Sequence, residues 1–171
     1  CPQKYEFQYV RGLPMEFVPD YLPFGKAIHE AAAFFYRHLK ETGLKAPVEE
    51  LTASFTSAWE KDTQRAIRYK EGEDQATLKE KGIQMLGAFY EKVNPRMIIG
   101  VEVPFAVDLA NQKTGEILPC KLVGIFDLIE SDEEGNNIIV ELKTGSKRYS
   151  EDQIDLDLQG ILSSYALQSM G

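Results

Sequence analysis

Two carboxylates and a lysine stand among aliphatic residues in the stretch GIFDLIESDEEGNNIIVELK, which runs from Gly124 to Lys143. Asp127 and Glu141 each interrupt an apolar run, and Lys143 follows two residues after Glu141. Carboxylate oxygens are ligands that hard divalent cations prefer. A neighbouring lysine can orient a metal-activated water and stabilise charge on a phosphate. The three side chains therefore indicate metal-dependent chemistry at a phosphate group.

The spacing of the two acids also predicts that they face each other. Side chains alternate along a strand, and a hairpin turn centred on Glu134 places Asp127 opposite Glu141. Opposite Cβ atoms lie ~5 Å apart, and like charges at that distance destabilise a sheet. Such a pair needs a cation, or one acid must stay protonated. The alternative is a solvent-facing strand of mixed charge in which Lys143 is only an ion-pair partner.

Residues 1–95 are predicted to be mainly helical. An aromatic lead-in over 1–20 contains three prolines and predicts irregular or short helical structure. A helix of about 16 residues opens at Pro23 and ends at Gly43, judged from its apolar period. A second helix starts at Pro47 and runs on towards Tyr69, and a third spans 73–93.

Residues 96–171 change to strand periodicity. Strands are expected over 97–109, 118–130 and 138–143, joined by short turns into an antiparallel meander. Ser150 and Gln153 predict a capping box that starts a last helix. Helices followed by consecutive strands and a final helix indicate one α/β domain over 1–171.

Composition narrows the class of protein. The chain has 171 residues, 43% of them hydrophobic, which is enough for one soluble domain with a core. We find no apolar stretch of membrane-spanning length and no signal peptide. Cys1 and Cys120 are the two cysteines of the sequence and form no disulfide framework, so a reducing, cytoplasmic location is expected. A net charge of −8 argues against a broad nucleic-acid-coating surface, although a local basic groove remains compatible with it. A start at Cys1 without methionine is typical of a piece cut from a longer protein, and we expect truncation at both ends.

Several stretches together resemble the PD-(D/E)XK nuclease superfamily, and more narrowly its RecB-like exonuclease branch. The Asp127 strand followed by Val140-Glu141-Leu142-Lys143 resembles the superfamily's catalytic hairpin. Four further stretches occur in the order of the branch: CPQKYEFQYVRGL (1–13), GKAIHE (25–30), VEVPFAV (101–107) and LQGILSSYAL (158–167). The resemblance implies a restriction-endonuclease-like core, with the meander in a mixed sheet flanked by helices and preceded by a helical segment.

The resemblance also implies roles for individual residues. Asp127, Glu141 and the backbone carbonyl of Leu142 would hold the metal, Lys143 would be the catalytic lysine, and His29 would be a further ligand. Without the resemblance, His29 reads as an ordinary helix histidine.

Glu102, Gln159 and Tyr165 are weaker candidates. Related nucleases sometimes place an acid near the metals on the strand of Glu102, and an exposed strand glutamate is an equal alternative. The branch usually pairs its glutamine with a tyrosine one helical turn later, but Ser163 occupies that place here. Tyr165 comes six residues after Gln159, which turns it ~120° away on a helix, so we expect at most one of the two to play the branch's role.

Four basic residues are candidates for contacts with DNA phosphates: Lys147, Arg148, Arg65 and Arg68. Solvated loops and helix faces are the alternative for all four.

The function implied by the resemblance is a Mg²⁺- or Mn²⁺-dependent DNA nuclease, exonuclease-like, with one or two ions. It would act in DNA repair, recombination or phage and defence DNA processing, beside a helicase or recombination partner. Some members bind an iron–sulfur cluster through four cysteines. Cys1 is at the place of the first, and Cys120 is away from the other three, so either the protein has no cluster or the sequence ends before those ligands. We expect no cluster in residues 1–171. The alternative function is a non-catalytic module of the same fold that binds DNA or a protein.

Overall fold

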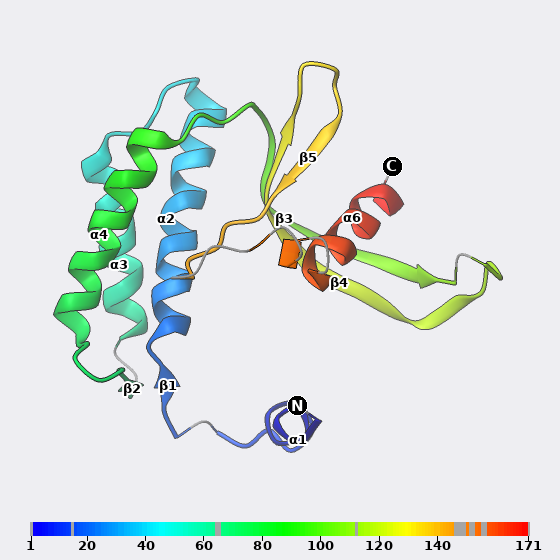
Figure 1. Cartoon of the computed structure of the whole chain (residues 1–171), viewed down its shortest axis with the longest axis horizontal. Helices are drawn as coiled ribbons and strands as arrows, with labels where there is room; N and C mark the ends of the chain where they lie inside the picture. Colours follow the sequence, from blue (N-terminus) through cyan, green and yellow to red (C-terminus); the bar gives the residue numbers. More distant parts are fainter. Residues whose placement is uncertain are drawn as a thin grey trace. The chain divides into compact units, whose positions relative to one another are not determined.

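The computed structural model describes residues 2–14, 16–63, 66–111, 113–145, 150, 153–154 and 157–170 (Figure 1). Contacts divide the chain into two compact units. The first comprises Cys1–Ala32 and Ala46–Lys92, and the second comprises Ala33–Lys45 and Val93–Gly171. One helix, α2 (Tyr21–Thr42), contributes residues to both units. Among the helices of the described residues, none combines the length and the low charge that a membrane-spanning segment needs.

The first unit is helical, as predicted. Its lead-in forms a short α-helix α1 (Pro2–Tyr5) and a π-helical turn η1 (Glu6–Val10). The first part of α2 follows, and then come α3 (Val48–Asp62) and α4 (Gln75–Lys92).

Helix α2 begins earlier than the sequence predicted, at Tyr21. The residue before it, Asp20, is almost fully buried and accepts the N–H of Lys70 on Oδ2 at 2.9 Å. Its carbonyl accepts the N–H of Phe24 at 3.2 Å. Asp20 thus fixes the start of the helix ahead of the proline at which the sequence pattern placed it.

The expected extension of α3 towards Tyr69 is wrong. The helix ends at Asp62, and β2 (Ile67–Arg68) pairs in parallel with β1 (Val18–Pro19). The N–H of Val18 donates to the carbonyl of Ala66 at 2.9 Å. These residues thus form sheet hydrogen bonds in place of another helical turn.

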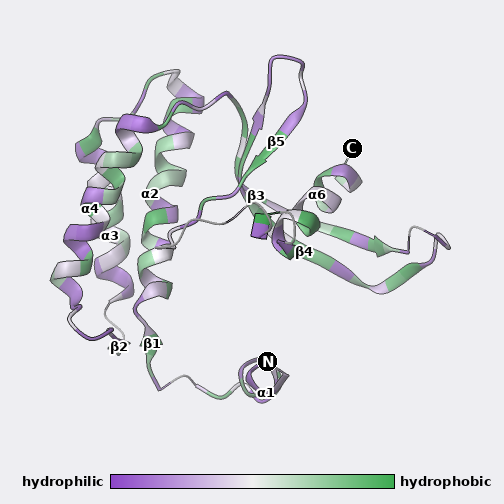
Figure 2. Ribbon diagram, viewed as in Figure 1, coloured by the Kyte–Doolittle hydropathy of each residue, from purple (hydrophilic) through white to green (hydrophobic). Residues whose placement is uncertain are grey.

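Aromatic side chains form the core of the first unit. Phe55 and Trp59 of α3 are fully buried and stack with ring centroids 6.5 Å apart. Phe24 of α2 packs edge-on against both rings, at 6.1 Å in each case. Figure 2 shows hydrophobic and hydrophilic residues alternating along the helical ribbons, as amphipathic helices require. Gly82 lets α4 approach α3, since a Cβ there would lie 2.1 Å from Cζ of Phe55.

Replacing Gly82 with alanine is expected to lower the free energy of unfolding by about 1–3 kcal/mol, because the buried Phe55 ring must move from a packed position. Gly87 of the same helix is the control, since a Cβ added there would meet nothing within 4 Å. Gly87→Ala should raise the free energy of unfolding by about 0.5–1 kcal/mol. Chemical denaturation of both variants measures the difference. Equal changes in the free energy of unfolding would show that the Phe55 ring moves without a loss of stability.

The second unit contains the predicted antiparallel meander, and the predicted α/β fold class is confirmed. Strands β3 (Met97–Ala110), β4 (Ile117–Ser131) and β5 (Asn137–Val140) form a sheet in the order β3-β4-β5, with α6 (Leu158–Met170) packed on β3 and β4 (Figure 1). The parallel pairing among the described residues lies in the separate β1-β2 sheet.

Two element boundaries in the second unit differ from the prediction. Strand β5 ends at Val140, so Glu141 and Lys143 follow the strand instead of lying within it. The predicted capping box forms, with hydrogen bonds of 3.0 and 3.3 Å between Ser150 and Gln153. However, α6 begins only at Leu158, because Asp157 caps it by accepting the N–H of Gln159 on Oδ1 at 3.2 Å.

The β4–β5 turn fixes the register that the sequence predicted. Asp132 accepts the N–H groups of Glu134 and Asn136 on Oδ1, at 3.0 and 2.8 Å, and the side-chain amide of Asn136 on Oδ2. These hydrogen bonds lower the pKa of Asp132, and the bond from the Asn136 side chain has the largest effect. The ladder pairs Leu128 with Val140, so the next opposed positions are 127 and 141.

The core of the second unit lies between the sheet and α6. Phe126 is fully buried, contacts Phe105 with ring centroids 4.4 Å apart, and clusters with Ala166 of α6. Gly124 lies under the ring of Phe105, where a Cβ would come within 2.5 Å of Cζ. This packing anchors the strand that holds Asp127.

A buried carboxylate lies at the end of β4. Glu130 is 6% exposed and accepts the N–H of Arg96 at 3.2 Å. Burial, and then the charge of Glu130, raises the pKa of Tyr36 in α2 to about 12.

Candidate active site

Asp127 links β4 to the segment that follows β5. Its Oδ2 accepts the backbone N–H of Leu142 at 2.9 Å. This bond holds Leu142, and with it Glu141 and Lys143, against the strand although the ladder pairs end at Val140. Glu141 thus follows β5 directly, at the position that continues the β4–β5 register opposite Asp127.

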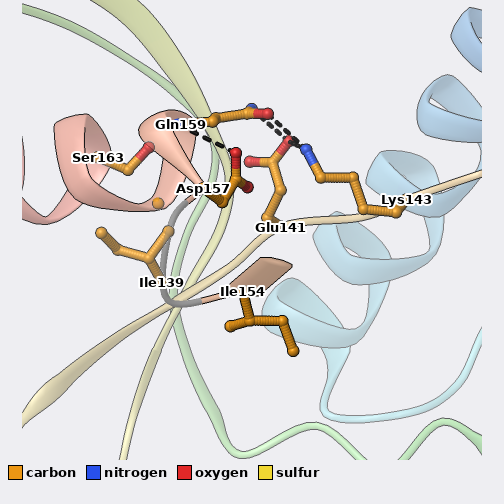
Figure 3. A pocket seen from close by; sticks show the side chains of 8 residues that line it. Ile139, Glu141, Lys143, Ile154, Asp157, Gln159 and Ser163 are labelled. Atoms are coloured by element: carbon orange, nitrogen blue, oxygen red, sulfur yellow. Dashed lines mark hydrogen bonds and ion pairs between the residues drawn. The ribbon is translucent and has the colours of Figure 1, made fainter. Parts of the chain in front are cut away.

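Glu141, Lys143 and Gln159 form a hydrogen-bonded group (Figure 3). The ammonium Nζ of Lys143 lies 3.1 Å from Oε1 of Glu141. The side-chain amide of Gln159, at the start of α6, accepts from Lys143 through its oxygen and donates to Glu141 through its nitrogen. The side chains of Glu141 and Lys143 are 26% and 36% exposed, so the group is open to a substrate. Gln159 therefore holds the carboxylate and the ammonium in one geometry.

Glu102 lies opposite Asp127 on the other neighbouring strand. The pairs Val101–Leu128 and Val103–Phe126 flank these two positions in the β3–β4 ladder. Carboxylate oxygens of Glu102 and Asp127 lie within 4.8 Å of each other, and both residues are half-buried. Glu102 has φ of +51°, which is rare for a residue with a side chain and costs ~1–2 kcal/mol. The backbone is thus strained at the position that presents a second acid to Asp127.

The strain predicts an unusual order of stability at position 102. Glu102→Gly should be more stable than Glu102→Ala by about 1 kcal/mol, because glycine adopts positive φ without penalty. Both variants remove the carboxylate, so the charge change cancels in the comparison. Ala106→Gly, in the same strand, should instead lose about 0.5–1 kcal/mol. Urea unfolding of the three variants measures this, and a more stable alanine at 102 would show that the strand relaxes without strain.

Glu102 and Asp127 are chemically suited to a divalent cation. Two half-buried carboxylates this close repel each other, and a cation between them offsets the repulsion while offering sites for both oxygens. Glu141, which directly follows β5 at the position opposite Asp127, would add a further oxygen. Metal binding by these residues, with the Leu142 carbonyl, stays a prediction.

The other predicted site residues fall into three groups. Tyr165 lies away from the Glu141 group, because its hydroxyl donates to the carbonyl of Asp108 at 2.7 Å and accepts the N–H of Ala110 at 3.0 Å. Arg68 belongs to the first unit, where its guanidinium lies 4.8 Å from the ring centroid of Phe17. His29 also belongs to the first unit, in α2, and its role as a ligand stays a prediction. Arg65, Lys147 and Arg148 lie outside the described residues.

A family model described as the PD-(D/E)XK nuclease superfamily matches residues 1–171. The chain belongs to the PD-(D/E)XK nuclease superfamily. Comparisons of this chain with curated proteins and with solved structures found no match. That membership is consistent with Asp127 as the acid of the first catalytic strand and with Glu141-Leu142-Lys143 as the ExK element, and both assignments stay predictions.

Asp157 is a site residue that our sequence reasoning missed. It caps α6 and lines the same hollow as Glu141 and Lys143 (Figure 3). Asp157 could have been recognised as a helix N-cap from its residue type. The capping box at Ser150 was the stronger signal, so the predicted helix began earlier in the sequence.

Proposed function

We propose that this chain is a Mg²⁺- or Mn²⁺-dependent deoxyribonuclease of exonuclease type that hydrolyses phosphodiester bonds. The observation that supports this most is the ExK arrangement in a PD-(D/E)XK chain. Lys143 donates a hydrogen bond to Glu141, and the backbone N–H of Leu142, which lies between them in the sequence, donates to Asp127.

Each residue of the proposed site has a distinct task. Asp127, Glu141 and Glu102 would hold one or two divalent ions, with His29 and the carbonyl of Leu142 completing the ligands. A bound ion supplies Lewis-acid activation of water and offsets phosphate charge. Lys143 donates a hydrogen bond to the attacking water or to the phosphate oxygen that gains charge. Gln159 keeps the Lys143 ammonium directed at that position.

We also propose the RecB-like branch within the superfamily. The order of the five sequence stretches supports it, and so does the bond from Gln159 to the ExK side chains. A role in DNA repair, recombination or defence beside a helicase follows from that branch.

The function is tested by comparing substrates under single-turnover conditions. We expect Mn²⁺-dependent release of short products from end-labelled linear DNA, with covalently closed circular DNA and RNA degraded much more slowly. Cleavage of closed circles at the linear rate would contradict the exonuclease assignment. Metal and DNA binding without any cleavage would instead establish the non-catalytic module.

His29 tests the proposed ligand set. His29→Ala should raise the Mn²⁺ concentration for half-maximal cleavage by at least ~10-fold, the scale on which metal sites respond to the loss of a supporting group. His38→Ala is the matched control on the same helix, where His38 lies 6.2 Å from the ring of Phe34. Metal titrations of the cleavage rate measure both variants. Superimposable curves for His29→Ala and wild type would remove His29 from the site.

A further inference from the structure

A cavity of about 320 Å³ lies beside the ExK residues in the second unit (Figure 3). Ile139 and Ile154 form its apolar side, and Ile154 is 60% exposed. Polar residues and the start of α6 line the rest of the cavity. These residues are Glu141, Lys143, Asp157, Gln159, Gly160 and Ser163.

The size and lining of the cavity suit one small, mostly apolar group. Ligand pockets span about 300–1,000 Å³ and combine apolar walls with a few polar groups. This cavity is at the lower end of that range, which is room for a single nucleoside. Two carboxylates, Glu141 and Asp157, outnumber the one ammonium of Lys143, so a second phosphate would be repelled, whereas a neutral sugar and base would not.

Ser163 keeps this space open. The residue lines the cavity one helical turn after Gln159. A larger side chain at this position would occupy the hollow. Gly160, on the same wall, adds no side chain, and nothing lies within 4 Å of where its Cβ would be.

We propose that this cavity binds the nucleoside attached to the scissile phosphate, an inference that rests on the proposed nuclease function. The phosphate lies at the Lys143 end, and the sugar and base contact Ile139 and Ile154. The carboxylate of Asp157, which caps α6 through one oxygen, provides a further acceptor for a sugar hydroxyl or a base amine. The cavity thus selects a single nucleotide at a chain end.

Adjacent serines of α6 allow a matched test of the cavity. Ser163→Leu fills it, whereas Ser164→Leu changes the exposed neighbour that does not line it. The probes are thymidine 5′-monophosphate, thymidine and inorganic phosphate, titrated in Ca²⁺ and followed by calorimetry. We expect Ser163→Leu to weaken thymidine monophosphate binding by at least ~10-fold, which corresponds to about 1.4 kcal/mol, and Ser164→Leu to leave it within ~2-fold. Phosphate binding should be the same in all three proteins.

Two further variants keep the test decisive. Gly160→Leu fills the cavity from a position with free space and replaces Ser163→Leu if that variant fails to fold. Ser163→Tyr fills the cavity with an aromatic ring, and we expect it to weaken nucleotide binding and to raise the KM for linear DNA.

The outcomes separate the cavity from the nuclease function. Unchanged nucleotide binding in the cavity-filling variants overturns the nucleoside site, whether or not the chain cleaves DNA. Faster cleavage by Ser163→Tyr also overturns it, because filling the cavity would then help the reaction. Nucleotide binding that depends on Ser163 in a chain without nuclease activity supports the site and refutes the proposed function alone.

Discussion

Replacing Lys143 with arginine is expected to reduce single-turnover DNA cleavage by at least ~100-fold, the scale of losing one transition-state donor. The change keeps the positive charge, so a simple counter-charge to Glu141 would survive it. An ammonium is a compact donor, whereas a guanidinium is a wider planar fork that cannot occupy the same place. The position of Nζ is defined by two hydrogen bonds, which it donates to the side chains of Glu141 and Gln159.

The control for this variant is Lys121→Arg. Lys121 forms an ion pair with Asp108 at 3.1 Å and is 59% exposed, so arginine there should leave cleavage unchanged. DNA binding in Ca²⁺ should remain in the Lys143→Arg variant. Near-normal cleavage by that variant would make Lys143 a counter-charge and end its catalytic assignment.

Glu141→Gln is expected to abolish detectable cleavage while the protein stays folded. The amide keeps an oxygen that accepts from Lys143 and Gln159, so the local geometry survives, but the charge that binds a cation is lost. Removing one of two opposed acids should not lower the free energy of unfolding by more than ~1 kcal/mol. Cleavage assays and thermal unfolding of the same preparation measure both effects.

Glu133→Gln provides the matched control for Glu141→Gln. Glu133 is exposed in the β4–β5 turn of the same hairpin, and its amide variant should cleave at the wild-type rate. Retained cleavage in Glu141→Gln, or equal loss in both variants, would show that the Glu141 carboxylate has no special role.

The β4–β5 hairpin could be predicted because local residues determine it. The Asp132 side chain accepts two backbone N–H groups of the β4–β5 turn, so the register follows from the sequence of the turn itself. The parallel β1-β2 pair could not be predicted in this way. Each strand has only two residues, which is too short for a period, and the partners are distant in the sequence.

Site features that depend on tertiary contacts were harder to predict from the sequence. The sequence indicated that Gln159 and Tyr165 point in different directions, and the structure shows Gln159 at the ExK residues and Tyr165 at the backbone of β3. In contrast, the positive φ of Glu102 had no sequence signal, because glutamate in a β-branched run reads as an ordinary strand residue. The cavity beside Lys143 likewise depends on where α6 begins.

The most direct test of the proposed centre is Mn²⁺-dependent cleavage of linear DNA by wild type and by Asp127→Asn. The asparagine oxygen can still accept the Leu142 N–H, so the variant keeps the local fold and loses only the charge. We predict no cleavage by EDTA-treated wild type, full recovery with added Mn²⁺, and no cleavage by Asp127→Asn at any Mn²⁺ concentration. Cleavage without metal, or by folded Asp127→Asn at the wild-type rate, would contradict a metal-dependent nuclease site built on Asp127.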